Sequence, residues 1–339
     1  MNTLFQNTLQ RRPQAVPPIW FMRQAGRYHK HYQGLRTQYS FDQLCKKPEV
    51  AAQVALGPVA EFDFDVSILF SDILFPLEGL GMGLEYTDHG PRLSFQLSPE
   101  TISQLGPVDK AIEFMSFQKE AMKATRAVLP SNKSLIGFVG GFWTLFVYAV
   151  EGSHAGSLTA SKKFAPLFPQ FMEKMFPLLQ ANIQLQLDGG AEVVMIFDTA
   201  AGEVSPHFFK TWIQPYLAKM AQLYPGKIGY YSKGTQRAFF DDAFTSLPWA
   251  GQGFDHRCYI PECFSVQNKG FVQGNFDQGL LFMDESDFKK SLTEWLRPMK
   301  DMPQAARAGW VCGLGHGVLP KTPEKHVKYF VDHVREVLS

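Results

Sequence analysis

Short apolar runs recur along the chain, and stretches with a helical spacing of apolar residues separate most of them. The runs are 18–22, 66–70, 135–139, 193–197, 228–231, 250–254, 270–272 and 310–314. The helical stretches are 44–62, 111–128, 207–223, 282–296 and 324–337, and 164–187 is similar although Pro166, Pro169 and Pro177 should break or kink it. Apolar residues every three or four positions form one face of a helix, whereas short β-branched and aromatic runs form buried strands. The pattern therefore predicts strands that alternate with helices.

Eight such strands, each followed by a helix, are typical of βαβ units and a parallel sheet. The count predicts an α/β fold, a single (β/α)8 TIM barrel with its active-site cleft at the C-terminal ends of the strands. An open doubly wound sheet is the alternative. No linker-like or low-complexity stretch divides the chain. We therefore expect one domain over residues 1–339.

The composition is that of an ordinary globular protein with one local concentration of positive charge. The chain has 339 residues, of which 45% are hydrophobic and 19% charged, and its formal net charge is +1. These values allow a large core and weigh against a nucleic-acid or membrane partner. The segment 23–36 nevertheless contains Arg23, Arg27, His29, Lys30, His31 and Arg36. We expect this segment to contact something anionic.

Two features of the sequence predict a reducing, cytoplasmic location. Residues 1–10 lack the basic and apolar regions of a signal peptide, and the longest apolar runs are shorter than a membrane span. The four cysteines, Cys45, Cys258, Cys263 and Cys312, form no C-x-x-C pair and are too few for a disulfide scaffold. We expect them to be buried free thiols.

The segment Arg23-Gln24-Ala25-Gly26-Arg27 directly follows the first apolar run. Small residues between the two arginines let the backbone turn tightly, so that both guanidinium groups and nearby N–H groups can face one cavity. Guanidinium groups bind carboxylates or phosphates through paired hydrogen bonds and stay charged when desolvated. The alternative is a surface turn with solvated arginines. Because the segment begins where a barrel strand ends, we interpret it as an anion-binding segment.

Asp72 lies at the end of the second apolar run and is followed by Ile73-Leu74-Phe75-Pro76. A carboxylate among apolar residues is costly unless a cation or hydrogen-bond donor meets it. A helix cap or an arginine partner would explain it structurally. The functional interpretation is an anion held against a developing positive charge or several N–H donors.

Three further polar side chains follow predicted strands. Gly140 and Gly141 end one strand and lead into an apolar helical run that contains Tyr148, which alone is more typical of a core stripe. Thr199 follows the most apolar strand, where a cap or turn is the alternative role. His316 lies between two glycines after the last strand, a context that favours hydrogen bonding to a carboxylate or proton transfer over packing.

Several motifs together resemble the uroporphyrinogen decarboxylase family. They are PPIWFMRQAGRY, FDVSILFSDIL, GFVGGFWTLFVYAVEG and LGHG, with VQGN at 272–275 and IFDTAAG at 196–202. The resemblance covers residues 5 to 333, nearly the whole chain. It implies a (β/α)8 barrel that forms a homodimer and uses no metal, prosthetic group or organic cofactor. The reaction it implies is decarboxylation of the four acetate side chains of uroporphyrinogen III to give coproporphyrinogen III in haem and porphyrin biosynthesis.

The resemblance also implies a set of site residues. The substrate-binding positions are Arg23, Gln24, Ala25, Gly26, Arg27, Asp72, Tyr148, Thr199 and His316. Asp72 would stabilise a cationic intermediate, and Arg23 or Arg27 would deliver a proton or bind the leaving carboxylate. The substrate carries eight carboxylates on an apolar pyrrolic ring system, which accounts for the cationic segment and for aromatic walls drawn from the 30 Phe of the chain.

Two other classes of protein are weighed against this interpretation. A zinc-dependent methyltransferase of the related barrel group, acting between a corrinoid and a thiol, would need His and Cys ligands at metal spacing. The chain has no H-x-x-x-H and no C-x-x-C, so no metal site is predicted. A non-enzymatic anion or RNA binder would carry a basic net charge and exposed aromatic residues among lysines. The net charge of +1 and the position of arginine at a strand end weigh against this alternative.

Overall fold

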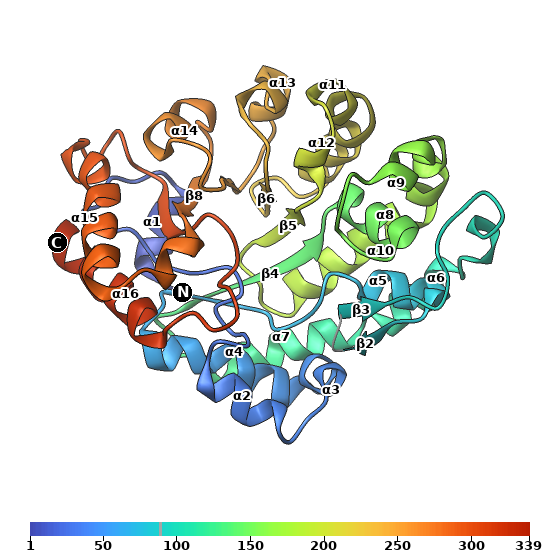
Figure 1. Cartoon of the computed structure of the whole chain (residues 1–339), viewed down its shortest axis with the longest axis horizontal. Coiled ribbons are helices and arrows are strands. Elements are labelled where there is room, and N and C mark those ends of the chain that lie inside the picture. Colours follow the sequence, from blue (N-terminus) through green and yellow to red (C-terminus); the bar gives the residue numbers. More distant parts are fainter. Residues whose placement is uncertain (88–89) are drawn as a thin grey trace.

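The computed structural model covers residues 1–339 and describes all of them except 88–89. Figure 1 shows the strands at the centre of the molecule and the helices around them. The seven central strands are β1 (Val66–Ile68), β4 (Ser134–Gly140), β5 (Val194–Asp198), β6 (Ile228–Ser232), β7 (Gly251–Gly253), β8 (Phe271–Phe276) and β9 (Trp310–Leu314). They form one parallel sheet in the order β1-β4-β5-β6-β7-β8-β9. A separate antiparallel pair joins β2 (Glu85–Thr87) to β3 (Gly90–Arg92).

Helices connect successive strands, as parallel pairing requires. Before β4 they are α1 (Thr3–Leu9), α2 (Lys30–Arg36), α3 (Phe41–Lys46), α4 (Pro48–Phe62), α5 (Phe75–Leu77), α6 (Val108–Phe114) and α7 (Phe117–Val128). After β4 they are α8 (Phe142–Glu151), α9 (Thr159–Lys163), α10 (Phe168–Asp188), α11 (Pro206–Phe208), α12 (Gln214–Leu223), α13 (Asp242–Thr245), α14 (Ile260–Val266), α15 (Glu285–Asp301) and α16 (Glu324–Leu338). No helix of the described residues is both long and apolar enough to cross a membrane.

The sheet curls around an interior of its own. One cluster of buried side chains takes members from both edge strands and from the strands between them; it comprises Phe5, Trp20, Met22, Val66, Ile136, Val193, Met195, Phe197, Tyr231, Ala250, Phe271 and Val311. Strands at opposite edges of a flat sheet could not share such a cluster, so the sheet bends round on itself. Phe5 of α1 packs on Phe271, the first residue of β8, and so covers the amino end of this interior. A larger cluster lies between the strands and the surrounding helices.

The predicted strand at 18–22 is present only as a short bridge. The Cys312 N–H donates to Pro18 O at 2.9 Å, and the Trp20 N–H donates to Cys312 O at 3.3 Å. On the other side, the Asp65 N–H donates to Ile19 O at 3.0 Å. The segment therefore touches both edges of the sheet but forms an isolated bridge instead of a strand. Proline at two successive positions removes backbone N–H donors, which limits the ladder.

Most predicted helices are confirmed, with boundaries moved by proline and by turns. The predicted helix 44–62 is two helices, α3 and α4, because Pro48 holds Lys47 in an extended conformation. The predicted helix 111–128 divides at Met115 and Ser116 into α6 and α7. By contrast, α10 continues through Pro177 as one helix. Packing on the core outweighs the local cost of that proline.

Candidate active site

Arg23 is the residue around which the predicted site residues gather. Its charge acts on Asp72 after β1, on Tyr148 of α8 and on His316 after β9. The carboxyl ends of parallel strands meet at one edge, so residues far apart in sequence converge there. Arg23 itself is exposed, and no carboxylate among the described ion pairs neutralises it. The site therefore carries an available positive charge.

The backbone holds Arg23 in an unusual position. Its φ of 60° lies in the left-handed region, which few residues other than glycine adopt. The neighbouring Met22 O accepts from the Val318 N–H at 2.9 Å, so the arginine turn is joined to the segment after β9. Gly317 makes room for the side chain, because a Cβ at this position would lie 2.5 Å from Arg23 Cδ. The first and last motifs of the sequence thus meet through this arginine.

Gln24 is buried, and its side chain bonds to the protein itself. Its Nε2 donates to Val66 O at 3.2 Å, and its Oε1 accepts from the Phe21 N–H at 3.3 Å. The Tyr28 hydroxyl donates to Gln24 O at 2.7 Å. These bonds fix the turn that presents Arg23. Ala25 and Gly26, which follow, are half-buried members of the same turn.

Arg27 ends the same segment and is exposed, and its charge acts on Tyr32. Its charge, together with that of Arg36, favours the ionised form of Tyr32, although burial is the larger influence and raises the pKa of Tyr32 overall. Arg36 also donates to Tyr39 O at 2.6 Å. The described structure places no charge effect of Arg27 on Asp72, Tyr148 or His316. The two predicted arginines therefore provide two separate cationic positions.

Asp72 is half-buried at the centre of the site. Burial raises the pKa of its carboxyl group, and the Leu74 N–H and the charge of Arg23 partly oppose this rise. The Leu74 N–H donates to Asp72 Oδ1 at 2.8 Å, which fixes the carboxylate in a local turn. The Asp72 charge in turn raises the pKa of Tyr148, although burial of the phenol is the larger cause. Asp72 and Tyr148 are therefore neighbours in the folded chain.

Thr144, which the sequence did not single out, connects the segments that carry Tyr148 and Thr199. Its Oγ1 donates to Asp198 Oδ1 at 2.7 Å and accepts from the Ala200 N–H at 3.0 Å. Asp198 is fully buried at the end of β5, and burial raises the pKa of its carboxyl group to about 6. Thr199 lies between Asp198 and Ala200, and Tyr148 lies one turn beyond Thr144 on α8. One hydroxyl group therefore sets the relative position of two predicted site residues.

His316 is half-buried beside Tyr231 of β6. The Tyr231 hydroxyl lies 2.9 Å from His316 Nδ1 and donates to Gly315 O at 2.8 Å. Burial, followed by the charges of Arg23 and Lys233, lowers the pKa of His316 to about 3. The imidazole is therefore neutral at neutral pH, which favours hydrogen bonding over proton transfer among the roles predicted for it.

Lys233 and His154 also lie close to the site. Lys233 directly follows β6 and is half-buried, and its charge lowers the pKa of both His316 and His154 after the effect of burial. The His154 ring lies 6.4 Å from that of Tyr148. Lys233 could be found from the sequence because it lies just after a predicted strand, where site residues are expected. His154 lies in a connecting segment and carried no such signal.

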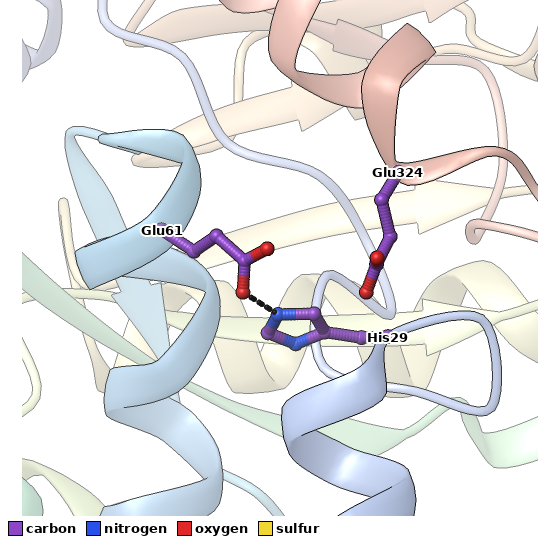
Figure 2. Close-up of side chains that lie close together, drawn as sticks. All are labelled: His29, Glu61 and Glu324. Atoms are coloured by element: carbon purple, nitrogen blue, oxygen red, sulfur yellow. Dashed lines mark hydrogen bonds and ion pairs between the residues drawn. The ribbon is translucent and has the colours of Figure 1, made fainter.

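The described residues contain one group of three side chains with the spacing of metal ligands, and it lies outside this site. Figure 2 shows Glu61 of α4 and Glu324 of α16 pointing toward His29, which precedes α2. His29 Nε2 lies 2.7 Å from Glu61 Oε2, and Glu324 Oε1 accepts from the Lys30 N–H at 2.6 Å. These contacts join three helices directly after the arginine turn. The prediction of no metal site stays a prediction.

The curled parallel sheet, with a carboxylate, cations and hydroxyl groups at the carboxyl ends of its strands, defines an α/β enzyme with a barrel-like sheet. A model of the uroporphyrinogen decarboxylase (URO-D) family matches residues 1–337. The chain belongs to the uroporphyrinogen decarboxylase family. The family and the carboxy-lyase class that the sequence resemblance implied are confirmed.

Individual relatives agree with this assignment over nearly the whole chain. A protein named uroporphyrinogen decarboxylase from Synechococcus sp. is 33% identical over 335 residues, which cover 94% of this chain and 93% of the relative. One of the same name from Thermus thermophilus is 30% identical over 351 residues and covers 100% of this chain and 99% of the relative.

Solved structures of proteins with other names share the fold of this chain. A methyltransferase from Methanosarcina mazei superimposes with a TM-score of 0.82 at 17% identity, and the match covers 100% of both chains. This likeness shows the fold alone. The more similar sequences carry the decarboxylase name, so the family of this chain is that of the decarboxylases and not that of the methyltransferase alternative.

Proposed function

We propose that this chain removes carbon dioxide from the four acetate side chains of uroporphyrinogen III and releases coproporphyrinogen III in haem and porphyrin biosynthesis. The observation that carries the proposal is the position of Asp72 beside Arg23 and Tyr148, in a chain of this family. A carboxylate, a cation and a phenol there match a substrate with anionic side chains and pyrrole N–H donors. The reaction uses no metal or organic cofactor.

The architecture of the proposed enzyme is a closed barrel in one domain. The segment 18–22 acts as the eighth strand, since it hydrogen-bonds to β9 on one side and to Asp65, directly before β1, on the other. The cluster of interior side chains shared by both edges of the sheet supports closure. Two copies assemble as a homodimer, as the resemblance to the family implies. The protein works in the cytoplasm, in keeping with its four free cysteines.

Asp72 stabilises the positive charge that develops during the reaction. A proton is added to a pyrrole ring carbon and makes that ring a cationic electron sink. The electrons of the bond between the acetate methylene and its carboxylate flow into the ring, and carbon dioxide leaves. The exocyclic methylene then takes a proton to become a methyl group, and the ring carbon loses its added proton. Asp72 faces the pyrrole N–H groups, where a preorganised carboxylate lowers the energy of the cation.

The cations around Asp72 hold the substrate carboxylates. Arg23, whose guanidinium has no acidic partner in the described ion pairs, binds the carboxylate nearest Asp72 or delivers the proton. Lys233, whose charge acts on His316, and Arg27, at its separate position after the arginine turn, bind further carboxylates. Tyr148, Thr199 and His316 contribute hydrogen bonds that orient the ring system. Gln24, Ala25 and Gly26 act by shaping the arginine turn.

The test is anaerobic incubation of the purified protein with uroporphyrinogen III, followed by oxidation and separation of the products by carboxylate number. We expect porphyrins with seven, six, five and four carboxylates to appear in turn. Asp72→Asn keeps an acceptor for the Leu74 N–H but removes the charge, so turnover should fall about a hundredfold or more. Asp109→Asn, at an exposed position in the first turn of α6, is the matched control. Binding of the substrate without any loss of carboxylates in the unaltered chain would contradict the proposal.

A further inference from the structure

A buried histidine and two glutamates converge outside the candidate active site, directly after the arginine turn. The side chain of His29 is fully buried, whereas the side chains of Glu61 and Glu324 are 49% and 19% exposed. The atoms of the three that could ligate a metal all lie within 4.8 Å of one another, and Figure 2 shows both glutamates pointing toward the imidazole. The three residues lie at the start of α2, in the last turn of α4 and at the start of α16. They are far apart in the sequence, so a search for closely spaced ligands does not find them.

The imidazole of His29 has no hydrogen-bond partner outside this group. Its Nε2 lies 2.7 Å from Glu61 Oε2, and its Nδ1 is buried with no partner among the described residues. Buried polar side chains are normally hydrogen-bonded. The interaction that accounts for this buried ring is therefore the one with the glutamates.

The two carboxylates bring more negative charge to this point than the described cations balance. Both raise the pKa of the Tyr28 hydroxyl, after the larger effect of its burial. Among the described ion pairs, Glu61 meets only His29, and the exposed Lys30 ammonium lies 4.0 Å from Glu324 Oε2. An exposed ion pair at such a distance contributes little. A cation held between the two carboxylates would remove their mutual repulsion.

We propose that His29, Glu61 and Glu324 bind one divalent transition-metal cation such as Zn²⁺, which joins α2, α4 and α16. One imidazole nitrogen and two carboxylate oxygens suit Zn²⁺, and a water molecule would complete a tetrahedral set. Mg²⁺ and Ca²⁺ prefer oxygen ligands alone, so the histidine selects against them. The cation is structural, since none of its three ligands belongs to the candidate active site.

The cysteines, which are the other common ligands of zinc, take no part in this group. All four are free thiols, and Cys45, Cys263 and Cys312 are buried, whereas Cys258 is half-buried. The expectation of buried thiols therefore holds for three of them and fails for Cys258. The proposed site binds its cation through nitrogen and oxygen alone.

Small movements of the glutamates would bring the three donors to bonding distance. Zinc lies about 2.0–2.2 Å from nitrogen and oxygen ligands, so atoms that share it are about 3.0–3.5 Å apart. The His29–Glu61 contact of 2.7 Å must open slightly, and the wider separations, all within 4.8 Å, must close. The Lys30 N–H donates to Glu324 Oε1 at 2.6 Å and so holds this carboxylate near the imidazole.

The environment of Nδ1 sets the affinity that we expect. A histidine that binds a metal through Nε2 carries its proton on Nδ1 and usually donates it to a carboxylate or carbonyl. Nδ1 of His29 has no such partner among the described residues, and the lack of one typically costs about 10–100-fold in affinity. We therefore expect a dissociation constant for Zn²⁺ in the micromolar range.

The bound cation would also fix the end of the arginine turn. The His29 N–H donates to Gly26 O at 2.9 Å, so the turn and the proposed ligand are joined through the backbone. Because the cation binds the folded chain and joins three helices, zinc at about a hundred times its dissociation constant should raise the melting temperature by about 3–5 °C.

The experiment titrates the chelator-treated, full-length protein with zinc chloride in a calorimeter and measures bound metal after dialysis. We expect one high-affinity Zn²⁺ per chain. Glu61→Gln keeps an acceptor for His29, and Glu324→Gln keeps one for the Lys30 N–H, so both variants should fold but bind zinc about a hundredfold more weakly. Glu49→Gln, at an exposed position in the first turn of α4, is the matched control and should bind as the unaltered chain does.

Anomalous diffraction at the zinc edge from crystals of the unaltered protein locates the cation without any variant. We expect a peak bonded to His29 Nε2 and to both carboxylates. A peak among other residues, or equal zinc affinity in all three variants, would overturn the proposal. An absence of binding up to about a hundred times the expected dissociation constant would overturn it as well. None of these measurements depends on decarboxylation.

Discussion

The Tyr231 hydroxyl lies between the Gly315 carbonyl and Nδ1 of His316, at 2.8 Å and 2.9 Å. A phenol has one proton, and a carbonyl can only accept, so the hydroxyl donates to Gly315 and accepts from a protonated Nδ1. The neutral imidazole then carries its lone pair on Nε2. His316 therefore approaches a substrate as a hydrogen-bond acceptor unless binding supplies a proton.

Tyr231→Phe removes the acceptor that fixes this tautomer. Nδ1–H and the Gly315 carbonyl both lose a partner, at a cost of about 1–3 kcal/mol for a buried group, and the Nε2–H tautomer should become more populated. We expect turnover to fall about tenfold because His316 loses its fixed orientation. Nitrogen NMR of His316 reports the tautomer directly. An unchanged tautomer in the variant would show that the hydroxyl does not orient the ring.

Gly317→Ala tests the close contact between the first and last motifs. The added methyl would lie 2.5 Å from Arg23 Cδ, so the arginine must move, while the flexible side chain can yield without unfolding the protein. We predict a KM for uroporphyrinogen raised about tenfold with a melting temperature changed by only a few degrees. Gly34→Ala, at an exposed position of α2 where a Cβ meets nothing within 4 Å, is the matched control. Equal kinetics in both variants would contradict the role of Arg23.

Lys233→Met tests a cation that lies at the carboxyl end of β6. Loss of one carboxylate contact should raise KM about tenfold and leave kcat nearly unchanged, and Lys233→Arg should restore most of the affinity. Lys227, exposed at the amino end of the same strand, provides the control variant Lys227→Met. The pKa of His316 and His154 should also rise in Lys233→Met, because Lys233 lowers both. Histidine NMR titrations measure these pKa values. Equal pKa values of His316 and His154 in Lys233→Met and Lys227→Met would show that Lys233 does not act at the site.

Sequence reasoning predicted the strands well because their information is local. Each apolar run is bounded by polar residues, and the residues at the run ends include Arg23, Asp72, Thr199 and His316. The sequence could not show that the segment 18–22 forms an isolated bridge and not a full strand. The length of a hydrogen-bonded ladder depends on which backbone N–H and C=O groups lie opposite it in the fold. It also missed Thr144, whose role comes from contacts to Asp198 and Ala200 more than fifty positions away.

Asp198→Asn should change how stability depends on pH. Burial raises the pKa of Asp198 to about 6 from an ordinary value of 3.8, so the folded state binds this proton more tightly than the unfolded state. The contribution of Asp198 to stability is therefore largest at low pH and is lost as pH rises through 6. Asparagine keeps an acceptor for Thr144 and cannot ionise, so it lacks this dependence. Between about pH 4.5 and about pH 7.5, the stability of the variant relative to the unaltered chain should increase by about 2 kcal/mol in urea unfolding. A difference that stays constant over this range would show that the buried carboxyl is already ionised at low pH.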